Sequence, residues 1–161
     1  MENKINKIQP IETKYKGYNF RSRLEARWAV YFDTIKLKWE YEKEGYQLSN
    51  GIRYLPDFYI DNFGFIEIKG TEPNDEELEK VRLLSEDLKT KCAIFVGIPH
   101  TETQGYRCFE DGKEICEMSF NRGSVNKWGQ IPYYGEIECY YPEDINKARS
   151  ARFEFGDVGN D

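Results

Sequence analysis

The chain has 161 residues, which suits one domain with a single hydrophobic core. Hydrophobic residues make up 39% of it and charged residues 32%, the composition of a globular protein. No apolar run approaches the ~18 residues of a membrane span, and the start MENKINKIQP has no signal-peptide apolar region, so we expect a soluble, cytoplasmic protein with no membrane partner.

Charge is distributed unevenly along the chain. The net charge is −6, but residues 1–27 contain seven basic and three acidic residues, a balance of +4, which leaves −10 for the rest. The acidic total gives no global attraction for nucleic acid. The basic amino-terminal edge fits either phosphate contact or a solvated charged arm.

The first expected helix begins at Ser22, in SRLEARWAVYFDTIK. Its large apolar residues recur at helical spacing, at positions 24, 28, 31, 32 and 35. Ser22 followed three positions later by Glu25 fits a capping box, which would give Glu25 a structural role.

Residues 39–70 are expected to form a three-stranded antiparallel meander. An aromatic-rich strand comes first, and Asn50-Gly51 is a strong signal for a hairpin turn. After it come IRYLPDFYI, the turn DNFG and FIEIKG. The second turn places the strand of Asp57 beside the strand of Glu67.

Residues 74–89 predict a second helix, with a proline before it and an acid-rich first turn. The apolar run CAIFVGI that follows is typical of a buried strand. A strand, a helix and a second buried strand predict a parallel crossover. Beyond it the sequence offers strand-like segments (EICEMSF, IPYYGEIECYY) and a basic helix candidate, EDINKARSARFEF.

The four cysteines are expected to be thiols, as is usual inside cells. Cys108 lies eight positions before Cys116 and eight after His100, and no C-x-x-C occurs. These spacings do not indicate a structural zinc site.

Three charged residues stand out in the meander. Alternation along a strand puts Glu67 and Lys69 on one face, next to Asp57 on the neighbouring strand. Two carboxylates held close together are unfavourable unless a positive group lies between them, and Mg²⁺ is a natural partner for oxygen ligands. A lysine beside such an ion is suited to phosphodiester hydrolysis.

Pro56-Asp57 followed ten positions on by Glu67-Ile68-Lys69 resembles the signature of the PD-(D/E)XK nucleases. The preceding helix with Glu25 resembles the first motif of that family. The resemblance covers about residues 20–98. Within the family, the chain looks most like small stand-alone members from phages and bacteria. It implies an α/β, restriction-endonuclease-like core: a mixed central sheet, with an antiparallel meander and a parallel crossover strand, flanked by helices.

The same resemblance assigns roles to individual residues. Asp57 and Glu67 would ligate Mg²⁺ or Mn²⁺ together with the backbone carbonyl of Ile68. Lys69 would position or activate the attacking water. Glu25 would hold a metal-bound water or a second ion. The helix over residues 74–89 often carries an auxiliary polar residue in this family, and the sequence does not select among Glu79, Lys80 and Arg82.

The function implied is a metal-dependent nuclease that cleaves DNA rather than RNA. Arg21, Arg23 and Arg27 are candidates for phosphate contact, with an exposed helical face as the equal alternative. Because the chain is acidic, a homodimer that joins two basic edges or a partner protein would have to supply affinity.

The alternative function is a binding module that keeps the nuclease fold without cleavage. Its partner would be a nucleic acid, a nucleotide or a protein, as in defence or counter-defence proteins. The intact Asp57, Glu67 and Lys69 argue against this alternative, because a binding module has no need of a metal pair.

The expected domain organisation is simple. Residues 1–17 form a basic, polar and irregular arm, and residues 18–155 form one nuclease-like domain. Within the domain, residues 20–98 are the core and 99–155 a C-terminal elaboration. Residues 156–161 are a tail.

Overall fold

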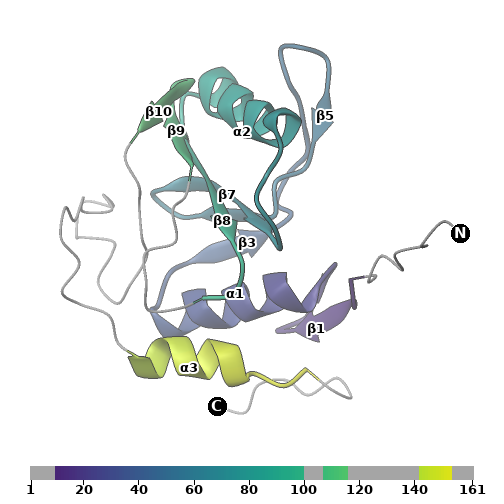
Figure 1. Cartoon of the computed structure of the whole chain (residues 1–161), viewed down its shortest axis with the longest axis vertical. Helices are drawn as coiled ribbons and strands as arrows, with labels where there is room; N and C mark the ends of the chain where they lie inside the picture. The colour runs from purple at the N-terminus through teal and green to yellow at the C-terminus, as the bar shows by residue number, and fades with distance from the viewer. Residues whose placement is uncertain (1–9, 100–106, 116–141, 154–161) are drawn as a thin grey trace, which may run out of the picture.

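A six-stranded sheet lies at the centre of the computed structural model, which describes residues 10–99, 107–115 and 142–153 (Figure 1). The strand order is β10-β9-β8-β7-β6-β3. The bounds are β3 (Trp39–Tyr41), β6 (Phe58–Ile60), β7 (Gly64–Lys69), β8 (Lys91–Val96), β9 (Cys108–Glu110) and β10 (Lys113–Ile115).

The sheet is mixed, as the sequence predicted. Strands β3, β6 and β7 form an antiparallel meander. Helix α2 (Asp75–Leu88) then connects β7 to β8, and these two strands are parallel over six paired positions. An α/β fold with an antiparallel meander and a parallel crossover is therefore confirmed.

One part of the meander differs from the prediction. A separate small hairpin, β4 (Tyr46–Gln47) with β5 (Arg53–Tyr54), interrupts the path from β3 to β6. Asn50-Gly51 closes this hairpin instead of joining two strands of the main sheet, with Gly51 at φ +85°. The first strand ends early because Glu42 adopts φ +44°, a left-handed conformation that a strand cannot continue.

The two faces of the sheet are covered by different helices. Helix α1 (Arg23–Thr34) packs on the face that carries Phe58, Ile66 and Ile68, and α2 packs on the face that carries Phe65. Alternation along β7 therefore places Glu67 and Lys69 on the α2 side.

The expectation of an irregular arm over residues 1–17 is corrected in part. Strands β1 (Thr13–Tyr15) and β2 (Tyr18–Phe20) form a hairpin that begins inside that range. Lys16 and Gly17 both have positive φ, 47° and 82°, as a two-residue hairpin turn requires. Tyr15 donates to Asp33 at 2.7 Å, which ties the hairpin to α1. Residues 1–9 lie outside the described residues.

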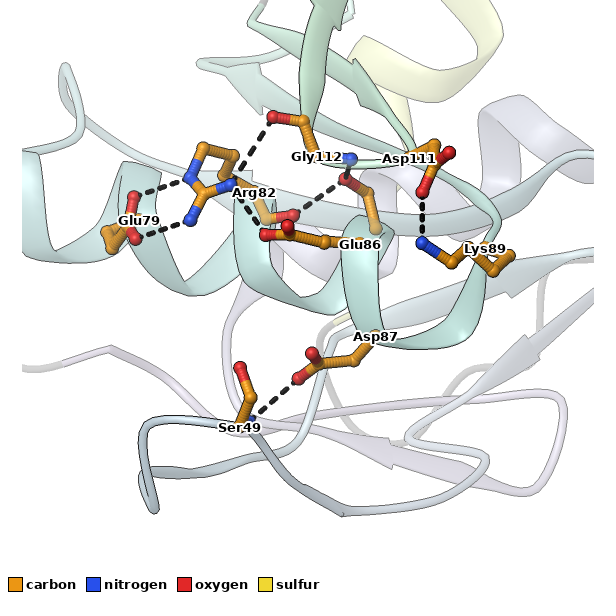
Figure 2. Close-up of polar contacts among 9 residues, drawn as sticks. Ser49, Glu79, Arg82, Glu86, Asp87, Lys89, Asp111 and Gly112 are labelled. Carbon is orange, nitrogen blue, oxygen red and sulfur yellow. Dashed lines mark hydrogen bonds and ion pairs between the residues drawn. The ribbon is translucent and has the colours of Figure 1, made fainter.

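Side-chain contacts join the C-terminal part of α2 to the β9–β10 turn and to the β4–β5 loop (Figure 2). Arg82 bonds Glu79 and Glu86 and donates to the Gly112 carbonyl in the β9–β10 turn. Asp87 accepts from the backbone N–H of Ser49, in the β4–β5 loop, at 2.8 Å. These contacts hold both hairpins against the helix.

The C-terminal half is described only in part. The predicted basic helix is present as α3 (Pro142–Ser150), which packs against α1 through the buried Ala148. The segment IPYYGEIECYY, most of EICEMSF and the tail lie outside the described residues. Cys92 and Cys108 are buried as thiols. Among the helices described here, none has the length and apolar character needed to cross a membrane.

Candidate active site

Asp57 lies immediately before β6, opposite Glu67 near the end of β7. Phe58 pairs with Ile66, and the same register carried one position further places Asp57 across from Glu67. The backbone N–H of Ile68 donates to Asp57 Oδ2 at 2.8 Å. Both residues are buried, Asp57 with 5% and Glu67 with 9% of its surface exposed. The structure thus brings together the two acids that the sequence proposed.

The turn before β7 depends on Gly64. Its φ is +136°, and a Cβ at this position would lie 2.0 Å from the Lys91 carbonyl oxygen. Only glycine permits so close an approach of the two chains. Asp61 is the first residue of the turn DNFG; it is exposed, and its backbone N–H donates to the Lys38 carbonyl.

The surroundings of Asp57 disfavour its charged form. Burial raises the pKa of this carboxyl, and the nearby charges of Glu67 and Glu25 raise it further. The Ile68 N–H and the Arg21 guanidinium act in the opposite direction, but the pKa stays well above its ordinary value. A cation between the carboxylates would relieve this repulsion.

Lys69 lies on the same side of β7 as Glu67, as expected. Its Nζ is 3.0 Å from Glu67 Oε1 and 3.1 Å from Glu77 Oε1, in the first turn of α2. Burial acts to lower the pKa of Lys69, but the two carboxylates outweigh burial and raise it. Lys69 is therefore a charged ammonium group at neutral pH.

Glu25 lies in the first turn of α1 and bonds both the N-cap residue and a residue of the sheet, while its expected role at a metal ion stays a prediction. Its backbone N–H donates to Ser22 Oγ at 3.2 Å, which caps α1. The Ser22 hydroxyl in turn donates to Glu25 Oε1 at 2.7 Å. The other carboxylate oxygen accepts from the Tyr41 hydroxyl, on β3, at 2.5 Å. Ser22 therefore caps the helix, and the Glu25 carboxylate bonds the Ser22 hydroxyl instead of its backbone N–H, so the expected capping box is only half formed. The same carboxylate faces the sheet and helps to raise the pKa of Asp57.

Of the three candidate arginines, Arg21 is the one with a described contact to the site. Its guanidinium pairs with Glu42 and lies 3.8 Å from Asp57 Oδ1. Arg23 is half-buried on α1, and Arg27 Nε is buried without a hydrogen-bond partner among the described residues.

Several polar contacts at this site were not foreseen. Tyr54 is buried and donates its hydroxyl to Glu67 Oε2 at 2.8 Å. Glu42 lies across from Asp57, since its N–H donates to the Asp57 carbonyl at 2.8 Å. Glu77 could have been suspected from its place in the first helical turn after the strand of Lys69. No sequence pattern indicated that Tyr54 contacts Glu67, because Tyr54 belongs to the inserted β4–β5 hairpin.

The structure also separates the three auxiliary candidates on α2. Glu79 and Arg82 pair with each other on the part of the helix that contacts the β9–β10 turn (Figure 2). Lys80 lies instead with its Nζ 5.8 Å from the centre of the Tyr54 ring. Among the three, Lys80 is the one whose described contact leads to the candidate site.

Comparison with known proteins adds no family. No family model matches the chain, and neither a curated protein nor a solved structure does. The family resemblance therefore stays a prediction that depends on the motif residues.

The residues present fit a hard divalent cation. An extended residue directs its N–H and its carbonyl to the same neighbouring strand, so the Ile68 carbonyl points to the side where Asp57 accepts its N–H. Both Glu67 oxygens have donors already, from Lys69 and Tyr54, and each can accept a further contact. Oxygen ligands of this kind suit Mg²⁺ or Mn²⁺.

The proposed site has few acidic ligands, which is consistent with an ion that keeps bound water. Within residues 10–99, 107–115 and 142–153, no three His, Cys, Asp or Glu side chains form a group able to hold a metal ion. A site of two carboxylates and one carbonyl does not require such a group, because Mg²⁺ usually keeps several waters and binds through one or two carboxylates.

Proposed function

We propose that the protein is a metal-dependent nuclease with a restriction-endonuclease-like core. It hydrolyses phosphodiester bonds, in DNA rather than RNA. The observation that carries the proposal is the buried pair of Asp57 and Glu67 on adjacent strands, with the Lys69 ammonium bound to Glu67. Two acids and a lysine in this arrangement match the chemistry of phosphodiester cleavage.

Asp57, Glu67 and the Ile68 carbonyl would hold the ion. Mg²⁺ or Mn²⁺ bound there would supply a Lewis acid for the phosphoryl group. Lys69 donates from its ammonium group and would orient the attacking water or stabilise charge on the phosphate. Arg21, whose guanidinium lies 3.8 Å from Asp57 Oδ1, would contact a phosphate oxygen.

The choice of DNA rests on the resemblance to the nuclease family. The net charge of −6 opposes tight binding by a single chain. We therefore include in the proposal a homodimer or a partner protein that supplies affinity.

The experiment is a cleavage assay with Mg²⁺ or Mn²⁺ on duplex, branched and single-stranded DNA and on RNA. We expect Asp57→Asn and Lys69→Ala to lower the rate at least ~100-fold, the scale of removing a group that stabilises transition-state charge. Asp61→Asn is the matched control, an exposed acid in the same hairpin, and should cut at the wild-type rate. Cleavage by both site variants at the wild-type rate would contradict the proposal.

A binding module is the second candidate, and one observation favours it. The Lys69 ammonium is shared between Glu67 and Glu77, as it would be in a purely structural ion-pair network. If the wild type binds nucleic acid or a nucleotide, cuts no substrate with either ion, and Asp57→Asn binds equally well, the binding module replaces the nuclease.

A further inference from the structure

We propose that Tyr54 is a positioning residue of the site, whose hydroxyl holds the Glu67 carboxylate in the orientation needed to ligate the ion. The inserted β4–β5 hairpin therefore forms part of the active site, although it lies outside the main sheet. This inference rests on the proposed nuclease function and adds a residue and an element to its metal site. Tyr54 is not itself a catalytic residue, because it acts through Glu67.

The Glu67 carboxylate is held at both of its oxygens. Oε1 accepts from the Lys69 ammonium at 3.0 Å, and Oε2 accepts from the Tyr54 hydroxyl at 2.8 Å. A carboxylate that is bound at one oxygen can still turn about its last side-chain bond, which has a broad torsional minimum. The donor at the second oxygen fixes the plane of the group. Each oxygen retains a further lone pair, so neither donor has to leave when an ion is bound.

The tyrosine adds direction to this contact and no charge. The Lys69 ammonium already supplies a positive charge at the other oxygen of Glu67. Burial and the charge of Glu67 raise the pKa of Tyr54 well above its ordinary value of 10.0, so its hydroxyl stays a neutral donor at neutral pH. A neutral donor suits a metal ligand, because it does not repel the incoming cation as a second lysine would.

Packing fixes the Tyr54 ring. The ring is buried in the hydrophobic cluster on the α2 side of the sheet, together with Val81 and Leu84 of that helix. Within the hairpin, Tyr54 pairs directly with Tyr46, whose ring contacts Phe65 of β7 with ring centres 5.5 Å apart. A side chain held in this way presents its hydroxyl at one position, which is what a metal ligand requires of the groups that support it.

A short, stiff segment joins Tyr54 to the other proposed ligand. Asp57 follows Tyr54 by three positions, and the buried Pro56 lies between them. The proline ring fixes φ at its own position and restricts Leu55 before it to extended conformations. The same segment therefore carries one proposed ligand, Asp57, and the donor that holds the other, Glu67. This connection keeps the two carboxylates in a constant relation to each other.

The test measures the affinity of the full chain for Mn²⁺ in the absence of substrate. Tyr54→Phe keeps the ring and removes only the hydroxyl. Its Kd for Mn²⁺ should rise about tenfold or more, the usual result of removing a hydrogen-bond partner of a metal ligand. Isothermal titration calorimetry measures the Kd. In the cleavage assay, the Mn²⁺ concentration that gives half the maximal rate should rise by the same factor.

Tyr15→Phe is the matched control. Tyr15 is also buried, and its hydroxyl donates at 2.7 Å to a carboxylate outside the proposed site, that of Asp33. Each variant loses one bond from a tyrosine to a carboxylate, so both should unfold at a lower urea concentration than the wild type. Only Tyr54→Phe should bind Mn²⁺ more weakly. A wild-type Kd in Tyr54→Phe, or an equal rise in both variants, would overturn the positioning role and leave the nuclease proposal standing.

A measurement on the wild type tests the same contact if Tyr54→Phe does not fold. A cation bound to Glu67 draws electron density from the carboxylate, which weakens the hydrogen bond from Tyr54. In a chain isotope-labelled at the tyrosine Cζ atoms, Mg²⁺ should therefore shift the assigned NMR signal of Tyr54 and leave that of Tyr15 unmoved. An unmoved Tyr54 signal at saturating Mg²⁺ would overturn the inference.

The affinity for Mn²⁺ also separates this inference from the proposed function. If the wild type binds Mn²⁺ but cuts no substrate, weaker binding by Tyr54→Phe than by Tyr15→Phe would support the positioning role without the nuclease. If the wild type binds no Mn²⁺, the positioning role is overturned together with the metal site.

Discussion

Asp57 is a carboxyl group that the fold buries against a second carboxyl group. Burial raises its pKa, as do Glu67 and Glu25. The folded protein therefore holds this proton more tightly than the unfolded chain, where the ordinary value is 3.8. Asp57 thus contributes unfavourably to folding at neutral pH, which is typical of residues kept for function.

The first prediction concerns stability without metal. Asp57→Asn should raise the free energy of unfolding at pH 7 by about 1 kcal/mol, the usual scale of a single substitution. The amide removes the buried charge and can still accept from the Ile68 N–H. Urea unfolding in metal-free buffer measures the change, and Asp61→Asn, at an exposed position, should leave stability within error.

The sign of the pH dependence follows from the raised pKa. Between the unfolded and folded pKa values of Asp57 the native state binds more protons, so its contribution to stability increases as the pH falls through the folded pKa. The advantage of Asp57→Asn over the wild type should therefore shrink as the pH is lowered below the folded pKa. A constant advantage at every pH would contradict the titration of Asp57.

At the scale of elements, the first turn of α2 connects helix capping to the site. Asn74 and Glu77 form a complete capping box, with both bonds at 2.9 Å. The second oxygen of Glu77 holds Lys69. The helix that joins β7 to β8 therefore also sets the position of the proposed catalytic lysine.

The second prediction uses this connection. Glu77→Gln should keep the cap, since glutamine can serve in a capping box, and should remove a negative charge beside Lys69. The pKa of Lys69 should fall. As the pH is raised, the variant should therefore lose its Lys69 ammonium, and with it cleavage, at a lower pH than the wild type does. At neutral pH we expect a loss of about tenfold, as for other residues that support a site indirectly.

Glu76→Gln is the control for this prediction. Glu76 is exposed, stands in the same helical turn and is not among the described partners of Lys69. Its replacement changes the helix charge equally and should leave the pH profile unmoved. If both variants shift the profile alike, the effect belongs to the charge of the helix terminus and not to the contact with Lys69.

At the scale of the whole molecule, the proposed ion should act as a ligand that stabilises the folded state. The two carboxylates come from strands that lie side by side only after folding. A ligand that binds the folded chain alone raises its stability, by about 2.7 kcal/mol at one hundred times its Kd. Metal binding can therefore be detected without knowing the substrate.

The third prediction follows. Adding Mn²⁺ or Mg²⁺ after removal of metal with EDTA should raise the Tm of the wild type by several degrees, as expected of a chain this long. Asp61→Asn should show the same rise, and Asp57→Asn should show none. Differential scanning fluorimetry measures the shift. Equal shifts in all three proteins would place the ion elsewhere, and no shift in the wild type would count against the metal site.

The sequence by itself determined the elements and residues that depend on short-range patterns. Helical spacing predicted α1 and α2, and the crossover rule predicted the parallel pairing of β7 with β8. Asp57 and Glu67 are only ten positions apart across one tight turn. Alternation along the strands was therefore enough to predict that they meet.

Only the tertiary structure decided which other groups reach that pair. Tyr54 belongs to a hairpin outside the main sheet, and Arg21 precedes the first helix, so no spacing relates either of them to Glu67 or Asp57. The hairpin could not be separated from the meander by sequence, because the Asn50-Gly51 turn fits both arrangements. Local periodicity specifies neighbours along one element or one turn, whereas packing between elements decides what surrounds a buried charge.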